Sequence, residues 1–293
     1  MTDLPKRKPD WLKVRFPGGA QYARIERYHR QQGLNSVCRS AACPNQGECW
    51  SKGTATFMIL GTNCSRLCQF CNVASGTLAS PDPEEPGKVA KAIAELELRH
   101  AVITSVTRDD LSDGGASQFA ALVKEIRQQA PDCRIELLIP DLQGDWSALR
   151  IITASGPDIL GHNIETVPRL YAKVRPGADY QRSLALLRET CRQAPELIIK
   201  SGLMLGMGET EAELLQAMQD LRNQDCRILT LGQYLAPSAD HYPVQCYITP
   251  ERFSAFATMG KEMGFQHVES GPLVRSSYHA EEQFAASQTT IEG

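Results

Sequence analysis

The stretch that decides the fold is Thr54–Cys71, TATFMILGTNCSRLCQFC, in which an apolar run leads directly into three closely spaced cysteines. Its first part, Thr56–Leu60, combines β-branched and large apolar residues, a composition typical of a buried strand. Glycine and polar residues follow and predict a loop at the carboxyl end of that strand. We therefore expect Cys64, Cys68 and Cys71 to share one loop at the carboxyl edge of a sheet.

Downstream, short apolar runs alternate with amphipathic segments of helical length, which is typical of βα units around a parallel sheet. Strands are predicted at Thr56–Leu60, Ala101–Val106, Arg134–Ile139, Asp158–Gly161, Leu197–Leu205 and Arg227–Leu231. Helices are predicted at Ala20–Gln32, Gly87–Glu97, Ala116–Gln129, Trp146–Ala154, Tyr180–Gln193, Glu211–Gln224 and Pro250–Met263. Six βα units are too few for the closed eight-stranded barrel, so the sequence predicts an α/β fold with a partial (β/α)6 barrel.

We expect three parts in the chain. Residues 1–53 would form an N-terminal extension that carries the first cysteines, and residues 54–269 would form the barrel. Residues 270–293 would be an irregular C-terminal tail. Polar and glycine-rich segments follow the predicted strands, and in parallel α/β proteins this rim is where active sites are assembled. These segments are Asn63–Cys71, Thr107–Gly115, His162–Thr166, Gly206–Thr210 and Gln233–Pro237.

Composition excludes several classes of function. The 293 residues carry a net charge of −3, which gives no bulk attraction for nucleic acid. No apolar run approaches the length of a membrane span, and the N-terminus lacks the apolar core of a secretory signal. We therefore expect a cytoplasmic protein. In that reducing compartment the ten cysteines are better explained as metal ligands than as disulfides, and six of them fall between positions 38 and 71.

The triplet Cys64, Cys68 and Cys71 has the spacing C-x3-C-x2-C. Structural zinc takes four protein ligands, whereas a four-iron cluster held by three cysteines leaves one iron open to a small molecule. Phe70 lies between the second and third cysteines and can cover a planar ligand. The alternatives are zinc with a fourth ligand from elsewhere, or thiols without metal.

A second triplet, Cys38, Cys43 and Cys49, has the different spacing C-x4-C-x5-C. Two triplets with different spacings are poorly suited to share one metal, so the sequence predicts a second cluster. The alternative is a structural zinc site with a remote ligand, although none of the six histidines lies close by in sequence. The remaining cysteines lack such neighbours and are interpreted as ordinary residues; they are Cys133, Cys191, Cys226 and Cys246.

The first triplet, with an aromatic residue before its last cysteine and its place after a strand, resembles the radical S-adenosylmethionine superfamily. In that superfamily the open iron chelates the methionine moiety, and reductive cleavage yields a 5′-deoxyadenosyl radical. Both triplets together resemble the lipoyl synthase family, and the likeness spans residues 8–280. Further stretches that carry it are Lys8–Leu12, Thr104–Gly115, His162–Leu170, Val174–Ser183, Lys200–Thr210, Leu231–Pro237 and Arg275–Tyr278 (RSSY). One departure is Thr107, which stands where that family commonly has Asp.

The resemblance implies a reaction. Lipoyl synthases insert two sulfur atoms at carbons six and eight of an octanoyl chain on a carrier lysine, and they consume two molecules of S-adenosylmethionine. It implies that the cluster on the upstream triplet donates the sulfur. A serine of RSSY would ligate its fourth iron, and a hard oxygen ligand is poorly matched to that iron and easily released. We assign Ser277 in preference to Ser276; a plain turn at both serines is the alternative.

The resemblance also implies partners. They are octanoylated lipoyl domains of 2-oxoacid dehydrogenases, the glycine-cleavage carrier protein, a ferredoxin or flavodoxin that donates electrons, and cluster-assembly proteins. Two rival functions are a different two-cluster radical enzyme, such as a methylthiotransferase, and a non-enzymatic iron–sulfur carrier or scaffold. The first normally needs an RNA-binding module, and no basic domain is visible in the sequence. The second needs no substrate cavity, whereas the rim predicts one.

Polar residues on the rim are candidates for the S-adenosylmethionine pocket. Asn163 and Glu165 suit the ribose hydroxyls. Thr107, Arg108 and Asp109 suit the methionine end. For each residue alone, a structural role such as helix capping is the alternative.

The other pocket candidates belong to later strands. Gly206 and Gly208 would permit close approach to the adenine, and Tyr234 would cover it. Lys200 is a charged residue inside an apolar strand and is expected to have a functional partner, because burying an unpaired charge is costly.

Overall fold

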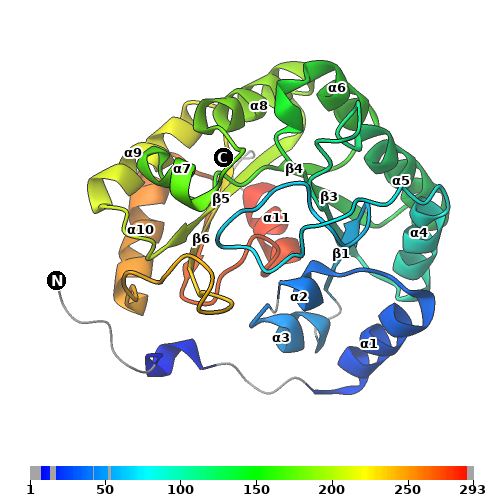
Figure 1. The fold of residues 1–293 in the computed structure, drawn as a ribbon, viewed down its shortest axis with the longest axis horizontal. Helices are drawn as coiled ribbons and strands as arrows, with labels where there is room; N and C mark the ends of the chain where they lie inside the picture. Colours follow the sequence, from blue (N-terminus) through cyan, green and yellow to red (C-terminus); the bar gives the residue numbers. More distant parts are fainter. Residues whose placement is uncertain (1–7, 14–17, 42, 52–53, 289–293) are drawn as a thin grey trace.

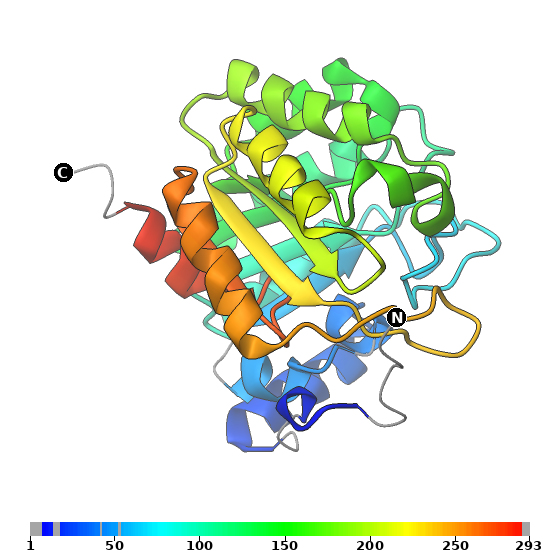
Figure 2. The same cartoon turned by 90° about the vertical axis from the view of Figure 1, so that its left-hand side faces the viewer.

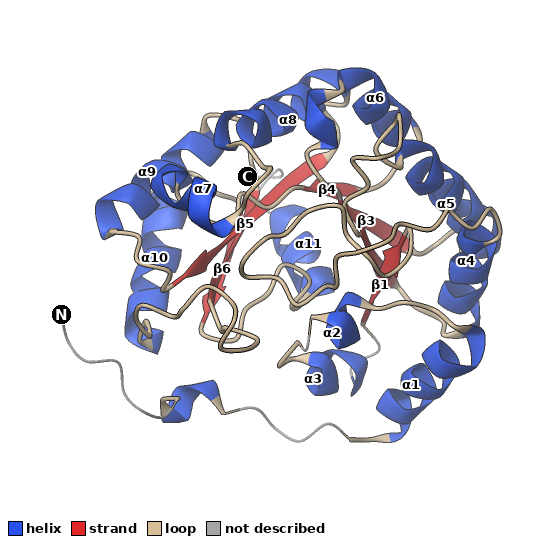
Figure 3. Cartoon of the chain, viewed as in Figure 1, coloured by secondary structure: helices blue, strands red, loops and turns tan. Residues whose placement is uncertain are grey.

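The computed structural model describes residues 8–13, 18–41, 43–51 and 54–288. The outermost parts of the predicted extension and tail, residues 1–7 and 289–293, lie outside the described residues. Seven strands form one sheet, each pairing in parallel with the next along the chain (Figures 1 and 3). They are β1 (Ala55–Ile59), β2 (His100–Ser105), β3 (Arg134–Leu138), β4 (Ile159–Gly161), β5 (Ile198–Leu205), β6 (Ile228–Gln233) and β7 (His267–Gly271).

The sheet order confirms the predicted parallel partial barrel, and β7 corrects the number of strands from six to seven. No pairing between β1 and β7 is present among the described residues, so the sheet is open. Strand β7, of sequence HVESG, is short and mostly polar. It pairs with β6 alone, and an edge strand has little apolar surface to reveal it in the sequence.

Six long helices cover the outer face of the sheet (Figures 1 and 2). They are α4 (Glu85–Glu95), α5 (Ala116–Gln129), α6 (Trp146–Ala154), α8 (Tyr180–Gln193), α9 (Glu211–Arg222) and α10 (Pro250–Glu262). Each lies within a few residues of its predicted range. Polar side chains cap several of them: Asp145 caps α6, Asp179 caps α8, and Thr210 forms a capping box with Glu213 at α9.

Further helical elements occur at the rim and in the N-terminal extension. They are α7 (Tyr171–Val174), the 3-10 turns η1 (Asp10–Leu12), η2 (Leu142–Gly144) and η3 (Pro168–Leu170), and the helices α1 (Ala20–Gln32), α2 (Val37–Ser40) and α3 (Gln46–Ser51). Helix α1 has the predicted bounds. Trp50 of α3 and Ile25 of α1 are fully buried in the same apolar core as β1, so the extension packs on the barrel.

The two open ends of the barrel differ. Helix α11 (Ala280–Gln288) covers the amino ends of the strands, where Phe284 packs with Ile159, Ile198 and Ile228. This helix corrects the prediction of an irregular tail. The carboxyl ends of the strands, with the extension beside them, are thus left to form a site (Figure 2). Over the residues described, the structure contains no helix with the length and apolarity needed to cross a membrane.

Candidate active site

The loop with the first triplet follows β1 and is tied to its neighbours by backbone hydrogen bonds. The Cys64 amide donates to the carbonyl of Ala74 at 2.8 Å, and the Ser65 amide donates to the carbonyl of Thr107 at 2.9 Å. The Gln69 amide donates to the carbonyl of Val174 at 2.8 Å. Contacts with the segments after β2 and before α8 therefore hold the three cysteines at the predicted rim.

The sulfur atoms of this loop have backbone donors. Cys64 Sγ accepts hydrogen bonds from the amides of Arg66, at 3.4 Å, and Thr107, at 3.3 Å. Cys71 Sγ accepts one from the amide of Val73 at 3.5 Å. Such N–H donors favour thiolate over thiol.

Burial disfavours the charged thiolate form of these cysteines. It raises the pKa of Cys68 to about 11, helped by the neighbouring charges of Cys71 and Cys64 and opposed by Arg175. Burial also raises the pKa of Cys71. A bound iron cluster removes this cost because coordinated thiols are deprotonated outright. Three neighbouring thiols on one loop, two of which accept amide hydrogen bonds, therefore fit a cluster. Within the described part of the chain, no three His, Cys, Asp or Glu side chains form a ready-made site for a single metal ion.

A buried arginine fastens the first cysteine loop to the rim. The guanidinium of Arg66 donates to Asp109 at 2.7 Å and to Asp141 at 2.6 Å. Asp141 is fully buried and also accepts from Arg182 at 2.8 Å. Both carboxylate oxygens of Asp109 are taken by Arg66, so the structure supports Asp109 as an anchor of the loop. Arg108 is similarly engaged, with Asp110 and with the carbonyl of Leu60.

Asn163 and Glu165 meet at the rim after β4, as expected. The Asn163 amide donates to the Glu165 carboxylate at 3.2 Å. Glu165 has a left-handed backbone with φ of 65°, a conformation uncommon for a residue other than glycine. Burial raises the pKa of Glu165, whereas Arg175, Asn163 and Arg275 lower it.

Two arginines of this site were missed by the sequence analysis. Arg175 donates to the carbonyl of Asn163 at 3.0 Å. Its positive charge lies close to Cys68 and Glu165. Arg275 is the first residue of RSSY. Burial lowers its pKa, whereas electrostatic interactions with Cys43 and Glu165 oppose that shift. Arg275 therefore lies between the two cysteine triplets. Both arginines fall within stretches that carried the family resemblance, which was the available signal.

The second triplet lies against the RSSY segment, more than two hundred residues away in sequence. The Asn45 amide donates to the carbonyl of Leu273 at 2.5 Å, and Tyr278 Oη donates to Glu48 at 3.1 Å. The Cys43 thiol has its pKa raised by burial and by Cys38, and lowered by Arg275. Thus the structure brings Ser276 and Ser277 to the same region as Cys38, Cys43 and Cys49. The Ser276 hydroxyl donates to Asn163 Oδ1 at 3.3 Å, which ties Ser276 to the rim of the first site.

Lys200 lies inside the barrel. Its Nζ donates to Glu136 at 2.7 Å, and His100 Nε2 lies 3.1 Å from the other oxygen of that carboxylate. Lys200 and Glu136 are each 1% exposed. The partner of Lys200 in the structure is therefore the buried carboxylate of Glu136, and its assignment to the cofactor stays a prediction.

The residues after β5 and β6 also pack closely. Tyr234 is buried, and its hydroxyl donates to the carbonyl of Tyr242 at 2.6 Å. Gly206 has a φ of +97°, and a Cβ there would come within 2.4 Å of the carbonyl of Cys246. This close contact requires glycine at position 206 whether or not a nucleotide binds there. Phe70 packs against the core beside the first loop.

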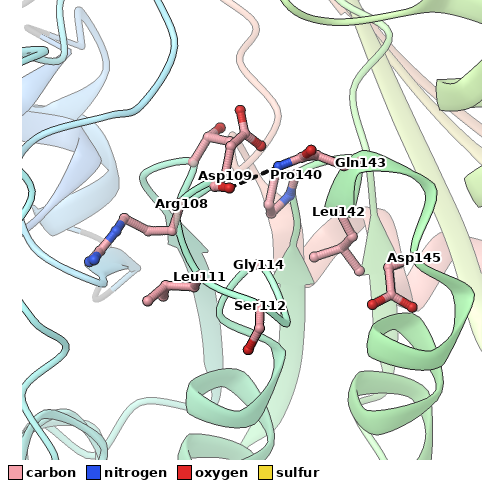
Figure 4. A pocket seen from close by; sticks show the side chains of 10 residues that line it. Arg108, Asp109, Leu111, Ser112, Gly114, Pro140, Leu142, Gln143 and Asp145 are labelled. Carbon is pink, nitrogen blue, oxygen red and sulfur yellow. Dashed lines mark hydrogen bonds between the residues drawn. The ribbon is translucent and has the colours of Figure 1, made fainter.

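A polar cleft of about 290 Å³ opens beside the first cysteine loop, between the segments that follow β2 and β3. Figure 4 shows Asp109, Gln143 and Asp145 at its edge, with the Gln143 amide donating to the carbonyl of Asp109 at 3.0 Å. Thr107, whose amide contacts Cys64 Sγ, lines the same cleft. Solvent thus reaches the neighbourhood of the first triplet from this side.

Comparison with known proteins agrees with this geometry. The sequence model of the family described as the radical SAM superfamily matches residues 58–221. Methylornithine synthase has a solved structure with a TM-score of 0.54 at 14% identity, covering 82% of this chain and 74% of its own. HydG, a maturase of the [FeFe]-hydrogenase, gives a TM-score of 0.55 at 10% identity, covering 90% and 75%. Fold and site together define a radical S-adenosylmethionine enzyme.

Proteins with similar sequences show which family of radical S-adenosylmethionine enzymes the chain belongs to. The lipoyl synthase of Roseiflexus sp. (strain RS-1) is 51% identical over 96% of this chain and 94% of its own length. The lipoyl synthase of Methylococcus capsulatus (strain ATCC 33009 / NCIMB 11132 / Bath) is 54% identical over 96% and 88%. That of Desulfotalea psychrophila (strain LSv54 / DSM 12343) is 53% identical over 96% and 94%. The chain belongs to the lipoyl synthase family.

Proposed function

We propose that this chain inserts two sulfur atoms at carbons six and eight of an octanoyl group on a carrier lysine. The first cluster would be held by Cys64, Cys68 and Cys71. The second would be held by Cys38, Cys43 and Cys49 with Ser277. When bound, the first cluster and S-adenosylmethionine supply the hydrogen-abstracting radical, and the second cluster supplies the sulfur. The proposed division into residues 1–53, 54–269 and 270–293 follows these roles.

The observation that carries the proposal is the meeting of three distant segments at one rim. The Ser276 hydroxyl donates to Asn163 Oδ1 at 3.3 Å on the rim of the first site, and Tyr278 Oη donates at 3.1 Å to Glu48, which directly precedes Cys49. An enzyme that transfers sulfur from one cluster to a carbon activated at the other needs both sites around one substrate. This arrangement supports a shared cavity better than two independent clusters.

The side chains around the first loop have separate tasks in this proposal. Arg66 keeps the loop in one conformation through its two carboxylates. Asn163 and Glu165 would orient the ribose, and Thr107 would lie at the methionine end. Arg175 supplies positive charge beside Cys68 and balances the charge of a cluster and of a bound carboxylate.

Partners follow from the same proposal. The substrates would be octanoylated lipoyl domains of 2-oxoacid dehydrogenases and the glycine-cleavage carrier protein, with a ferredoxin or flavodoxin as reductant. Cluster-assembly proteins would rebuild the second cluster, and the reaction would take place in the cytoplasm.

A Ser277→Cys variant tests the assignment of the serine. Thiolate is a better matched ligand for iron than hydroxyl oxygen, so the second cluster should persist and sulfur insertion should fall. S-adenosylmethionine cleavage should continue. The measurement is iron content and lipoyl product after anaerobic reconstitution, with Ser276→Cys as the matched control. The same behaviour in Ser276→Cys alone would transfer the role to Ser276.

A further inference from the structure

A carboxylate and a phenol join the two chain segments that surround the second triplet. Glu48 directly precedes Cys49, and Tyr278 directly follows Ser277. Tyr278 Oη donates to Glu48 Oε2 at 3.1 Å, and His279 Nε2 lies 3.5 Å from Glu48 Oε1. One side chain of the cysteine segment therefore contacts two consecutive residues of what we call the C-terminal strap, residues 272–279.

The far end of the strap is held by a further set of contacts. His279 Nδ1 lies 3.6 Å from Glu269 of β7 and 3.7 Å from Glu282 of α11. The rings of Tyr278 and His279 stack with centroids 3.8 Å apart. His279 also has a φ of 55°, an uncommon conformation that persists only where surrounding contacts determine it. These contacts fix the direction in which the strap leaves Ser277.

The near end of the strap is fixed separately. The Asn45 amide donates to the carbonyl of Leu273. A Cβ at Gly232 of β6 would come within 2.0 Å of the carbonyl of Val274, so the strap passes against the strand where only glycine fits. Ser277 therefore lies between two anchored points, and each anchor includes a residue of the second cysteine segment.

We propose that Glu48 and Tyr278 form a latch that positions Ser277 at the second triplet while the cluster is lost and rebuilt. The inference rests on the proposed function, in which Cys38, Cys43, Cys49 and Ser277 hold the sulfur donor. A cluster that gives up sulfur cannot itself hold its ligands together. The latch consists only of protein atoms, so it keeps the ligand set organised for the next cluster.

The exposure of the latch determines what it affects. The Glu48 side chain is 46% exposed, and contacts at such positions add little to global stability. The expected effect is therefore local. Glu48 and Tyr278 are positioning residues, and their loss should change the second cluster without changing the first.

The test compares Tyr278→Phe and Glu48→Ala with Tyr180→Phe. Tyr180 Oη donates to Asp220 at 2.8 Å on the outer helices, so this control loses the same kind of hydrogen bond away from both triplets. The full chain is reconstituted anaerobically, and iron loss to a chelator is followed by Mössbauer spectroscopy. We expect Tyr278→Phe and Glu48→Ala to lose the second cluster about five- to tenfold faster than wild type, the effect of one ordinary intramolecular hydrogen bond at a partly exposed position.

Two further results sharpen the test. Glu48→Gln keeps an acceptor oxygen and should recover much of the cluster lifetime. The double variant Glu48→Ala with Tyr278→Phe should behave like Glu48→Ala alone, because that substitution already removes the bond to Tyr278. Production of 5′-deoxyadenosine and the thermal midpoint should match those of Tyr180→Phe.

The possible outcomes distinguish failure of the latch proposal from failure of the proposed function on which it rests. If wild type itself holds only one cluster, the proposed function is wrong and the latch has nothing to position. If wild type holds two clusters but the latch variants retain them as Tyr180→Phe does, only the latch is wrong. Equal loss of both clusters would also contradict it, because that result indicates a general folding defect.

Discussion

The two cysteine triplets are held in different ways. The loop with Cys64, Cys68 and Cys71 directly follows β1. Backbone hydrogen bonds join it to segments that follow other strands of the sheet. The segment with Cys38, Cys43 and Cys49 is bonded mostly to itself, through turns such as Cys43 to Cys38 and Cys49 to Asn45. Its long-range contacts near the site come from Asn72, which follows Cys71 and donates to the carbonyl of Ser40 at 2.9 Å, and from the C-terminal strap at the opposite end of the chain.

This difference matches the different fates that the proposed function gives to the two clusters. A cluster that cleaves S-adenosylmethionine repeatedly must survive each turnover, and a rigid barrel rim suits that need. A cluster consumed as a sulfur source must be released and replaced, and two segments clamped together by side chains suit that need. In the proposed function, the chain would keep the lasting cofactor on the barrel and the consumed one between its two ends.

The largest expected effect comes from removing one ligand of each triplet. Cys64→Ala should abolish both 5′-deoxyadenosine and sulfur insertion, because no radical is formed. Cys38→Ala should abolish sulfur insertion while 5′-deoxyadenosine is still produced. Product analysis by mass spectrometry after anaerobic reconstitution distinguishes the two. Loss of S-adenosylmethionine cleavage in Cys38→Ala would mean that the triplets do not work independently.

The next largest effect is expected from a glycine substitution that disturbs the contact between the strap and β6. Gly232→Ala would force a methyl group against the backbone of Val274 and displace the strap. We expect sulfur insertion to fall by about a hundredfold, the effect of a misplacement of about 1 Å at a reacting centre, with S-adenosylmethionine cleavage largely kept. Gly87→Ala is the control, since a Cβ there meets nothing within 4 Å. Equal loss of both activities in Gly232→Ala would place the strap in the first site as well.

The rigidity of the first loop is tested at Arg66. Arg66→Met leaves the buried carboxylate of Asp141 without one of its cations, and breaking such a pair costs about 3–5 kcal/mol. Arg169→Met removes an exposed ion pair with Glu213 and should cost at most about 1 kcal/mol. Urea unfolding of the metal-free chain measures both. Similar small losses would show that the loop is not held by Arg66.

Acid dependence tests the barrel interior below the site. Burial opposes the charge of Glu136, but Lys200 and His100 outweigh it and lower the pKa of Glu136 from 4.5 to about 2. This carboxylate therefore stabilises the fold fully above about pH 4.5, and its contribution of about 3 kcal/mol is lost as the pH falls towards 2. Glu136→Gln should be less stable at pH 7 and show a weaker acid dependence in urea unfolding. An unchanged acid dependence would contradict the ion pair.

Much of the barrel could be predicted because its strands are buried on both faces and read as apolar β-branched runs. Strand β7 could not, since HVESG lies at the sheet edge and carries three polar residues. Helix α11 was also missed. Its sequence AEEQFAASQ offers one large apolar residue, Phe284, whose burial depends on the amino ends of three distant strands.

The cysteines of both triplets and the RSSY segment were identified from spacing and resemblance. The contacts that organise these residues could not be predicted, because they join segments far apart in the chain. Arg275 and Glu48 acquire their surroundings only when the strap meets the second triplet. Lys200 was expected to have a functional partner, whereas the contact observed is with Glu136, which only the barrel register brings to it.

The central claim is that the second triplet holds the sulfur that ends in the product. The most direct measurement uses chain reconstituted with a heavy sulfur isotope to about eight irons, four for each cluster. It is then given S-adenosylmethionine, reductant and an octanoyl-lysine peptide without free sulfide. The account predicts lipoyl product with the heavy isotope at both positions, at most one per chain, and no product from the Cys38→Ala chain. Sulfur of natural isotopic abundance in the product, or lipoyl formation by Cys38→Ala, would contradict it.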